Sequence, residues 1–418
     1  MKRYYYILVF LFLFIPLYVN GLEYPKTNSK IVEIYDINDN SVLYEIGNKD
    51  KVSIASLTKI ATTITAIENI KNLDEKVTIT KNILNTVSNK ASVAGLKVGD
   101  VVTYRDLLYA SMVPSGADAT NALAILSSGS IDNFVNKMNE LAKRIGLVNT
   151  HFVNVTGLDA DNHYSTAEET RKLLAYALSN DLFKQIFMTR DYTLTNGLKV
   201  KSTLYLYNPG NKLDTSIIMG SKTGHTKQAG YALSSLSNIN GHQMIVTVLK
   251  ATYDGKYNNI IDSLNLIRFL MTNYNYQVLV NKDELIKSLP VTLSKIEKYD
   301  IKSTKEIKKY LPSDYDKDKI RIEYDGKEEL NFTNKRDKKI GTIKYYYDNE
   351  LLDSEDVFLN TEIKMDLWKV LLHYWYIVLV IILIVITIII LIIKKRKKQL
   401  KNKKRYVIIN GERRLYES

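Results

Sequence analysis

The sequence contains no cysteine among its 418 residues. Disulfide bonds, thiol catalysis and cysteine-ligated metal centres are therefore excluded. An exported protein of this length does not need disulfides, because its hydrophobic core is large enough to stabilise the fold. Hydrophobic residues make up 45% and charged residues 25% of the chain, which is typical of globular domains. The length indicates two folded parts with additional segments.

A basic surface spread along the chain is also lacking, although the formal net charge is +13. Residues 394–418 contain eleven Lys or Arg and two Glu, so this tail alone contributes +9. The rest of the chain is only modestly basic, and its tyrosines are scattered without a base-stacking pattern. We therefore expect no nucleic-acid partner.

Charged residues are absent from the apolar run 375–393, whose nineteen residues would span about 28 Å as a helix, roughly one bilayer core. Aromatic residues precede this run and Lys394-Lys395-Arg396 follows it, which is typical of a membrane-spanning helix, and we assign this helix to residues 371–393. The positive-inside rule places the tail 394–418 in the cytoplasm and the preceding chain outside the cytoplasmic membrane. A buried core helix is the alternative, but the two flanks argue against it.

The N-terminus begins with Met1-Lys2-Arg3, and an apolar stretch follows from residue 4 to residue 19. This pattern predicts a signal peptide over residues 1–21. An uncleaved N-terminal anchor is the alternative. In both cases residues 22–370 are exported.

The exported part is predicted to contain two domains. Hydrophobic spacing indicates a domain over residues 22–275 in which helices pack on an antiparallel sheet, an α+β fold. Short alternating runs over residues 276–370 predict a small β domain, in which we find no catalytic constellation. The main elements expected in the first domain are a hairpin over 30–47, helices near 56–70, 130–146, 166–180 and 260–271, and strands at 217–219, 231–237 and 244–249.

Ser56 and Lys59 stand where an extended segment gives way to a helical pattern. A spacing of three places both side chains on one face of the helix. A serine hydroxyl becomes a strong nucleophile when a nearby base takes its proton, and a lysine can be that base if its pKa is lowered. A serine N-cap followed by a surface lysine is the alternative, because Ser-x-x-Lys is a weak motif when taken alone.

Two later stretches strengthen the catalytic interpretation. Ser115 lies at a predicted helix junction, where a hydroxyl can project into a cleft. Lys222-Thr223-Gly224-His225 lies at the end of a predicted strand, and its glycine lets a substrate approach the backbone closely. In chain order, these elements resemble the Ser-x-x-Lys, Ser-x-Asn and Lys-Thr-Gly motifs of penicillin-recognising serine enzymes.

The wider sequence around these motifs resembles the low-molecular-mass penicillin-binding proteins, specifically the serine-type D-alanyl-D-alanine carboxypeptidases. The resemblance covers about residues 25–275 and extends weakly into the small β domain. It rests on Ala55-Ser56-Leu57-Thr58-Lys59-Ile60, Ser115-Gly116 with Asp118-Ala119, Gly157-Leu158 with His163-Tyr164-Ser165-Thr166-Ala167, and Lys222-Thr223-Gly224-His225-Thr226 with Ala229-Gly230-Tyr231. It implies a penicillin-binding/β-lactamase-like fold and an enzyme that trims cell-wall peptides on the outer face of the cytoplasmic membrane.

The resemblance also implies a role for each motif residue. Ser56 would attack the D-Ala–D-Ala bond, Lys59 would be its general base, and Ser115 would relay a proton to the leaving amine. Lys222 and Thr223 would receive the free carboxylate of the substrate, and Gly224 would allow its close approach. The backbone N–H groups of Ser56 and His225 would form the oxyanion hole. The implied partners are peptidoglycan stem peptides ending in D-Ala-D-Ala, with β-lactams as covalent inhibitors and no cofactor.

Ala117 departs from the family pattern, which has asparagine at the third position of Ser-x-Asn. This change puts substrate positioning in doubt and leaves a non-catalytic penicillin-binding sensor or cell-wall-binding protein as one alternative. A class A-type β-lactamase is the other, although Glu168-Glu169 lack the asparagine expected after them. Turnover of a D-Ala-D-Ala peptide separates the carboxypeptidase from both.

No metal site is predicted. His151 and His163 lie in a loop together with Asp159 and Asp161. These four residues do not form a paired ligand motif, so a structural role is the more economical interpretation.

Overall fold

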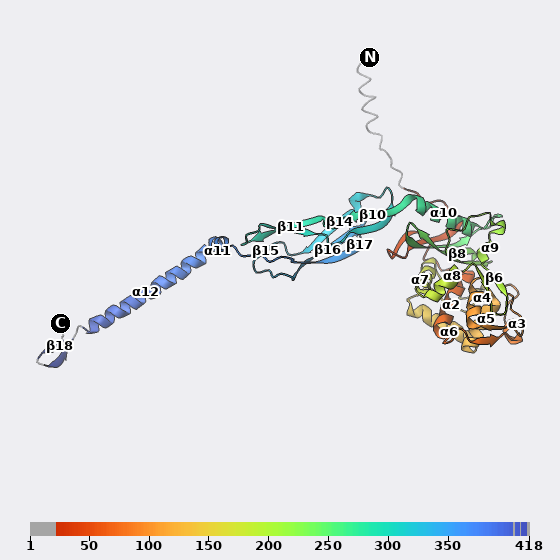
Figure 1. Cartoon of the computed structure of the whole chain (residues 1–418), viewed down its shortest axis with the longest axis horizontal. Helices are drawn as coiled ribbons and strands as arrows, with labels where there is room; N and C mark the ends of the chain where they lie inside the picture. The colour runs from red at the N-terminus through yellow and green to blue at the C-terminus, as the bar shows by residue number, and fades with distance from the viewer. Residues whose placement is uncertain (1–21, 404–405, 410, 416–418) are drawn as a thin grey trace, which may run out of the picture. The chain divides into compact units, whose positions relative to one another are not determined.

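The computed structural model describes residues 22–403, 406–409 and 411–415. The predicted signal peptide, 1–21, lies outside the described residues. The chain divides into two compact units (Figure 1). One contains the residues up to Tyr276 together with Tyr310–Tyr315, and the other contains Gln277–Lys309 and the residues from Asp316 onward.

The first unit is built on a five-stranded antiparallel sheet in the order β2-β1-β9-β8-β7. Its strands are β1 (Ser29–Asp36), β2 (Ser41–Ile46), β7 (Gly220–Thr226), β8 (Gly230–Ile239) and β9 (His242–Ala251). Both faces of the sheet are covered, because successive residues of a strand point to opposite faces. Ile31 and Leu249 pack into one hydrophobic cluster, whereas their neighbours Val32 and Val248 pack into the other.

Helices cover both faces of this sheet. The cluster on one face includes side chains from α2, α4, α5, α6, α7 and α8, and α10 lies over the other face. The helices are η1 (Ala55–Leu57), α2 (Thr58–Asn69), α3 (Lys81–Asn85), α4 (Tyr104–Met112), α5 (Ala117–Ser128), α6 (Ile131–Arg144), α7 (Ala167–Leu178), α8 (Asp181–Met188), α9 (Thr203–Leu206), η2 (Pro209–Asn211) and α10 (Asn258–Asn273). Two small hairpins, β3 (Lys76–Thr78) with β4 (Val101–Thr103) and β5 (Asp191–Thr193) with β6 (Lys199–Lys201), complete the unit.

The α+β prediction is confirmed. Two local predictions are wrong, namely a strand at Ile217–Met219 and the position of Lys222 at the end of a strand. Ile217–Met219 is not a strand, since it leads into β7, which begins at Gly220. Ile218 is apolar because it packs into the cluster under α10. Lys222 therefore lies within a strand and not at its end. Ser56 lies in the 3₁₀ turn η1, immediately before α2 begins.

The second unit consists mainly of β strands, as predicted from its short alternating runs. Its sheets have the orders β12-β11-β15 and β14-β16-β17, and β10 pairs with β13. The elements are β10 (Tyr274–Val280), β11 (Leu285–Thr292), β12 (Lys298–Lys302), β13 (Ile307–Pro312), η3 (Lys317–Lys319), β14 (Ile320–Gly326), β15 (Leu330–Asn331), β16 (Lys339–Tyr347) and β17 (Glu350–Phe358). Leu289, Ile301 and Ile343 are buried in its core.

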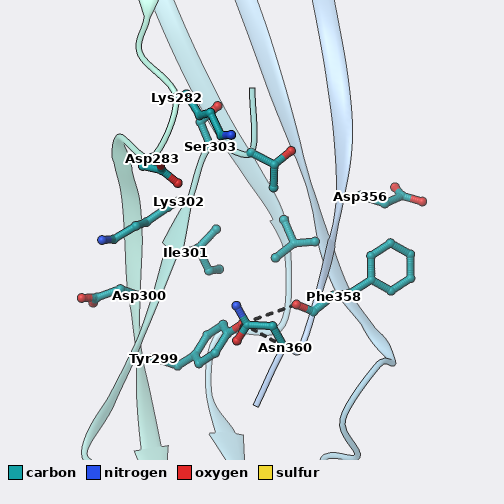
Figure 2. A pocket seen from close by; sticks show the side chains of 12 residues that line it. Lys282, Asp283, Tyr299, Asp300, Ile301, Lys302, Ser303, Asp356, Phe358 and Asn360 are labelled. Carbon is teal, nitrogen blue, oxygen red and sulfur yellow. Dashed lines mark hydrogen bonds between the residues drawn. The ribbon is translucent and has the colours of Figure 1, made fainter. Parts of the chain in front are cut away.

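A cavity of about 430 Å³ lies in the second unit, lined by β12 and by residues at the end of β17 (Figure 2). On its wall the Tyr299 hydroxyl donates a hydrogen bond to the Asn360 side-chain oxygen at 3.0 Å. The lining includes lysine and aspartate side chains, and the hydroxyls of Ser303 and Thr304 in it donate hydrogen bonds to the carboxylate of Glu355.

The apolar run predicted to cross the membrane is helical. After α11 (Leu367–His373), helix α12 (Trp375–Lys403) contains a candidate membrane span, Trp375–Lys401, whose most apolar stretch of 18 residues has a mean hydropathy of 3.7. No residue of this segment's most apolar stretch is buried inside the structure, so α12 is not a core helix of either unit. Its length and composition fit a membrane span. A short hairpin, β18 (Tyr406–Ile409) with β19 (Glu412–Leu415), follows.

Candidate active site

Ser56 lies in a turn that is held on two sides by glycines. Ala55, just before it, has a φ of 47°, a left-handed conformation that costs energy for a residue with a side chain. A Cβ on Gly157 would lie 1.9 Å from the carbonyl oxygen of Ala55, and a Cβ on Gly224 would lie 3.1 Å from its Cβ. A side chain at position 157 would displace the turn, and one at position 224 would fit only if its neighbours moved by a few tenths of an ångström, so the two glycines let the loop and strand β7 pack closely against the turn. The structure therefore fixes the position of the Ser56 hydroxyl.

Lys59 is the immediate partner of Ser56. Its Nζ donates to the Ser56 Oγ at 3.2 Å and to the carbonyl oxygen of Thr156 at 2.8 Å. The side chain is 2% exposed, and this burial lowers the pKa of Lys59 to about 7, while the charge of Asp118 acts in the opposite direction. A large fraction of Lys59 is therefore uncharged near pH 7, the form in which an amine can accept the proton of a serine.

The loop that supplies Thr156 is held by Asn154. The Asn154 side-chain oxygen accepts hydrogen bonds from the backbone N–H groups of Thr156 and Gly157, and its amide donates to the carbonyl of Leu158. These bonds fix both the carbonyl that binds Lys59 and the glycine that touches the Ser56 turn. The sequence interpretation did not identify Asn154, and its position in a polar loop was the only available indication.

Asp159 and His163 connect the same loop to the site. Asp159 accepts hydrogen bonds from the hydroxyls of Ser53 and Thr226. The Nδ1 of His163 accepts from the Val153 N–H, so its Nε2 donates to the Thr58 hydroxyl. Burial lowers the pKa of His163 to about 4, so the ring is neutral at pH 7. Both side chains are therefore engaged with protein groups around the Ser56 turn.

Ser115 has a buried hydroxyl without a hydrogen-bond partner among the described residues. Its φ of 63° is in the left-handed region, between the end of α4 and the start of α5. Asp118, in the first turn of α5, accepts backbone hydrogen bonds from Ala94, Gly95 and Leu96 and so ties this junction to the preceding loop. A buried polar group with no partner is costly, and such groups are found at sites where a substrate supplies the missing contact.

Lys222 is fully buried in β7, and its Nζ donates to the carbonyl oxygen of Thr223 at 3.0 Å. Burial, followed by the charge of Lys59, lowers the pKa of Lys222 well below its usual range. The Thr223 hydroxyl shares a hydrogen bond of 2.6 Å with Thr203. The protonated form of Lys222 is therefore disfavoured in this environment, and an anion bound beside it would favour that form.

Gly224 and His225 continue β7 past the Ser56 turn. A Cβ on Gly224 would lie 3.2 Å from the backbone nitrogen of Ser56, which places this part of β7 against the N–H of the nucleophile turn. The His225 imidazole is exposed and stacks on Tyr231, with ring centroids 4.1 Å apart. The imidazole is therefore directed to Tyr231, and only the backbone N–H of His225 remains a candidate for the oxyanion hole.

Ala117 is buried, and its N–H donates to the carbonyl of Ser92 at 2.7 Å. Asn121 is the nearest asparagine later in α5, but its amide donates to the carbonyl and to the hydroxyl of Thr86. Asn121 therefore does not replace the amide that the family pattern has at position 117.

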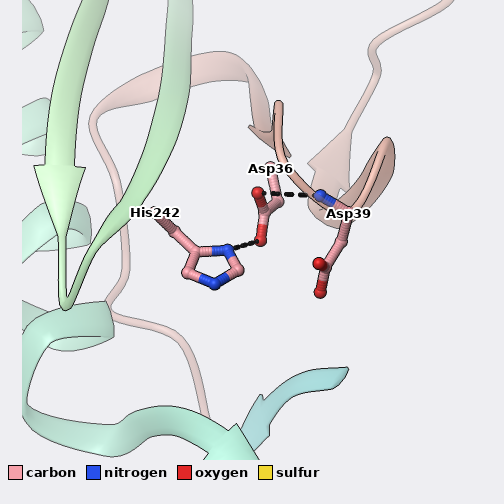
Figure 3. A group of neighbouring side chains, drawn as sticks. All are labelled: Asp36, Asp39 and His242. Carbon is pink, nitrogen blue, oxygen red and sulfur yellow. Dashed lines mark hydrogen bonds and ion pairs between the residues drawn. The ribbon is translucent and has the colours of Figure 1, made fainter. Parts of the chain in front are cut away.

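Asp36, Asp39 and His242 form the one group of potential metal ligands found among the described residues (Figure 3). The His242 Nδ1 contacts Asp36 at 2.6 Å, and the other Asp36 oxygen accepts from the backbone N–H of Asp39. The two Asp39 oxygens accept from the Tyr276 hydroxyl and the Tyr310 N–H. All four carboxylate oxygens thus have protein donors, which is the arrangement of a structural cluster.

Comparison with known proteins agrees with this site. The family model described as D-alanyl-D-alanine carboxypeptidase matches residues 19–253. A D-alanyl-D-alanine carboxypeptidase from a Streptomyces species is 38% identical over 224 residues, which is 51% of this chain and 77% of the relative. D-alanyl-D-alanine carboxypeptidase DacF from Bacillus subtilis is 26% identical over 349 residues, covering 80% of this chain and 86% of the relative.

The fold is also similar to that of a solved structure. Penicillin binding protein 5 from Haemophilus influenzae superposes with a TM-score of 0.61 at 25% sequence identity. The similarity covers 81% of this chain and 99% of that protein.

Proposed function

The chain belongs to the D-alanyl-D-alanine carboxypeptidase family of serine peptidases, and from this premise we propose that residues 22–275 release the terminal D-Ala from cell-wall peptides through an acyl-enzyme on Ser56. The observation that carries this assignment is the contact between the Ser56 hydroxyl and the buried amine of Lys59. The Ser56 hydroxyl is thus a nucleophile whose base, the uncharged amine of Lys59, lies 3.2 Å away.

In the proposed reaction, Ser56 attacks the carbonyl carbon of the D-Ala–D-Ala bond while Lys59 takes the hydroxyl proton. The backbone N–H groups of Ser56 and His225 stabilise the negative charge that develops on the carbonyl oxygen. The C–N bond then breaks, and the proton reaches the leaving amine through the hydroxyl of Ser115. Water attacks the resulting ester and releases the shortened peptide together with the free Ser56.

Lys222 and Thr223 are proposed to bind the carboxylate of the leaving D-Ala. Burial and the charge of Lys59 lower the pKa of Lys222, and a carboxylate bound beside it would raise that pKa again, because an opposite charge favours the protonated amine. The same carboxylate would accept a hydrogen bond from Thr223, whose hydroxyl already contacts another hydroxyl and can rotate. The site therefore favours peptides with a free C-terminus.

The β-lactamase alternative requires a glutamate that activates the deacylating water. Glu169 is buried and accepts hydrogen bonds from the N–H groups of Val148 and Asn149 and from the Thr150 hydroxyl. Glu168 pairs with Lys172 at 2.6 Å. Both carboxylates are engaged in structural contacts, which favours the carboxypeptidase.

The proposed function is tested by D-Ala release from a peptide ending in D-Ala-D-Ala, with the full chain in detergent. We expect repeated turnover in steady-state assays. A protein that binds penicillin covalently but releases no D-Ala would be the sensor, and rapid penicillin hydrolysis without D-Ala release would identify a β-lactamase.

Ala117→Asn is expected to increase kcat/KM for D-Ala release by roughly three- to tenfold, because one or two neutral hydrogen bonds to the substrate backbone are restored. Asn121 cannot supply them, since its amide is bonded to Thr86. The assay should be accompanied by a melting curve, because position 117 is buried. A well-folded variant with unchanged or lower kcat/KM would show that the substrate needs no amide here.

The C-terminal apolar helix supports a membrane-anchored enzyme, and we propose that its catalytic part faces outward with the basic tail 394–418 in the cytoplasm. This orientation is supported by the lysines and arginines that begin at Lys394, immediately after the apolar part of α12. A chain ended after residue 370 should be recovered in soluble, active form outside the cell. Its recovery with membranes would instead assign the anchor to the N-terminal segment.

A further inference from the structure

Asp118 is a buried carboxylate to which the proposed reaction assigns no role. It lies in the first turn of α5, three residues after Ser115, and is 2% exposed. Its two oxygens accept hydrogen bonds of 2.8 to 3.0 Å from the backbone N–H groups of residues 94–96, and one of them also accepts from the N–H of Ala119. These four donors offset the cost of burying a charged carboxylate next to the proposed site.

The loop held by this carboxylate packs against the Ser115 turn at two further points. The Ala117 N–H donates to the carbonyl of Ser92 at 2.7 Å. A Cβ on Gly116 would lie 2.7 Å from the Cβ of Ala94, so the loop packs this closely because residue 116 has no side chain. Ser115 has a strained φ of 63°, which persists because the surrounding contacts maintain it. Without the carboxylate bonds, this turn would lose part of the support that positions the Ser115 hydroxyl.

Asp118 also acts on Lys59 through its charge. The Lys59 Nζ is hydrogen-bonded to two neutral groups, the Ser56 hydroxyl and the Thr156 carbonyl. Burial lowers the pKa of Lys59 to about 7, and the charge of Asp118 acts in the opposite direction. Lys222, on β7, is a second buried amine, and it offers no negative charge. Without Asp118, the pKa of Lys59 would therefore lie below 7.

The loop 151–163 brings two further titratable groups towards the Ser56 turn. Asp159 accepts hydrogen bonds from the hydroxyls of Ser53 and Thr226. His163 is neutral at pH 7 and is bonded to the Thr58 hydroxyl. Both side chains are thus engaged by groups other than the Lys59 amine.

We propose that Asp118 is a positioning residue, which holds the Ser115 turn through its backbone hydrogen bonds and keeps a negative charge near the Lys59 amine. The inference rests on the proposed function, because Asp118 would act through the base and the proton relay of that reaction. A neutral side chain at this position should give a weaker base and a less well placed relay.

The test measures the pH dependence of Ser56 acylation by penicillin, with the full chain in detergent. Asp118→Asn keeps the size of the side chain and removes its charge. The pH at which the rate levels off should fall by about one unit, because the charge that raises the pKa of Lys59 has been lost. Above that pH the rate should be roughly three- to tenfold lower than in the unmodified protein, because an amine with a lower pKa is a weaker base.

Asp106→Asn is the matched control. Asp106 is also a buried carboxylate in the first turn of a helix, α4. It accepts hydrogen bonds from the Thr103 N–H and from the N–H and hydroxyl of Thr195. Both variants should lower the melting temperature, since an amide replaces one acceptor oxygen by a donor. Only Asp118→Asn should shift the pH profile of acylation.

Asp118→Ser is a second neutral variant, in which a smaller side chain avoids facing the loop N–H groups with an amide donor. It should show the same shift of the pH profile. An unchanged profile in a folded neutral variant, or an equal shift in Asp106→Asn, would overturn the positioning role while leaving the carboxypeptidase assignment intact. Absence of both acylation and D-Ala release in the unmodified chain would overturn the proposed function itself, and the role of Asp118 with it.

Discussion

Ser56→Ala protein is expected to form no covalent adduct with penicillin and to release no D-Ala. The reason is chemical, because the acyl-enzyme needs the Ser56 oxygen and alanine offers no atom that can replace it. The fold should survive, since Ser56 is half-buried and its hydroxyl has one hydrogen bond to the part of the chain that the structure describes, the bond that it accepts from Lys59. Mass spectrometry of the intact protein after penicillin treatment measures the adduct, and a melting curve verifies the fold.

Ser127→Ala provides the control for this experiment. Ser127 is a partly buried serine in α5 whose hydroxyl bonds the Leu123 carbonyl, so its loss removes a similar contact outside the site. This variant should be labelled as fast as the unmodified protein. An adduct that persists on Ser56→Ala protein would mean that another residue is the nucleophile.

The parts of the fold that sequence analysis predicted are those in which local pattern and tertiary role coincide. The helical pattern after Ser56, in which isoleucines recur three or four residues apart, predicted α2, and Ile60 and Ile64 are fully buried in it. The alternating runs predicted β8 and β9, whose residues divide between the two clusters. In these elements burial alone determines the residue pattern.

Strand β7 could not be predicted in the same way. Its sequence, GSKTGHT, contains no large apolar residue, yet Lys222 and Thr223 are buried. Burial of polar residues is costly and occurs where a function requires it, so a functional strand does not show the usual hydrophobic pattern. The apolar Ile217–Met219 next to it was consequently mistaken for the strand.

The sequence indicated the residue types of the candidate site, but it did not indicate which other residues hold them in position. The carbonyl that binds Lys59 belongs to Thr156, ninety-seven residues away, and is positioned by the side chain of Asn154. Contacts of such separation follow from the tertiary fold, and no local pattern encodes them. The left-handed Ala55 and Ser115 are also set by surrounding packing, since neither residue type favours that conformation.

The rate of Ser56 acylation by penicillin should rise with pH and level off above about pH 7. Burial lowers the pKa of Lys59 to about 7 in the folded protein, so its neutral form dominates above that pH and its protonated form below it. Only the neutral amine can accept the Ser56 proton. The rate should therefore fall about tenfold for each pH unit below the pKa. A pH-independent rate between pH 5 and 8 would contradict this assignment.

Lys59→Arg should reduce the rate of acylation by about 10²- to 10⁴-fold, which is the usual contribution of a general base. A guanidinium keeps its proton at any pH that the protein tolerates, so the pH dependence described above should also disappear. Lys143→Arg, at an exposed position in α6, should change neither the rate nor its pH profile. Retention of the pH profile in Lys59→Arg would assign the base to another group, and Lys222, the other buried lysine whose pKa is lowered, would be the next to replace.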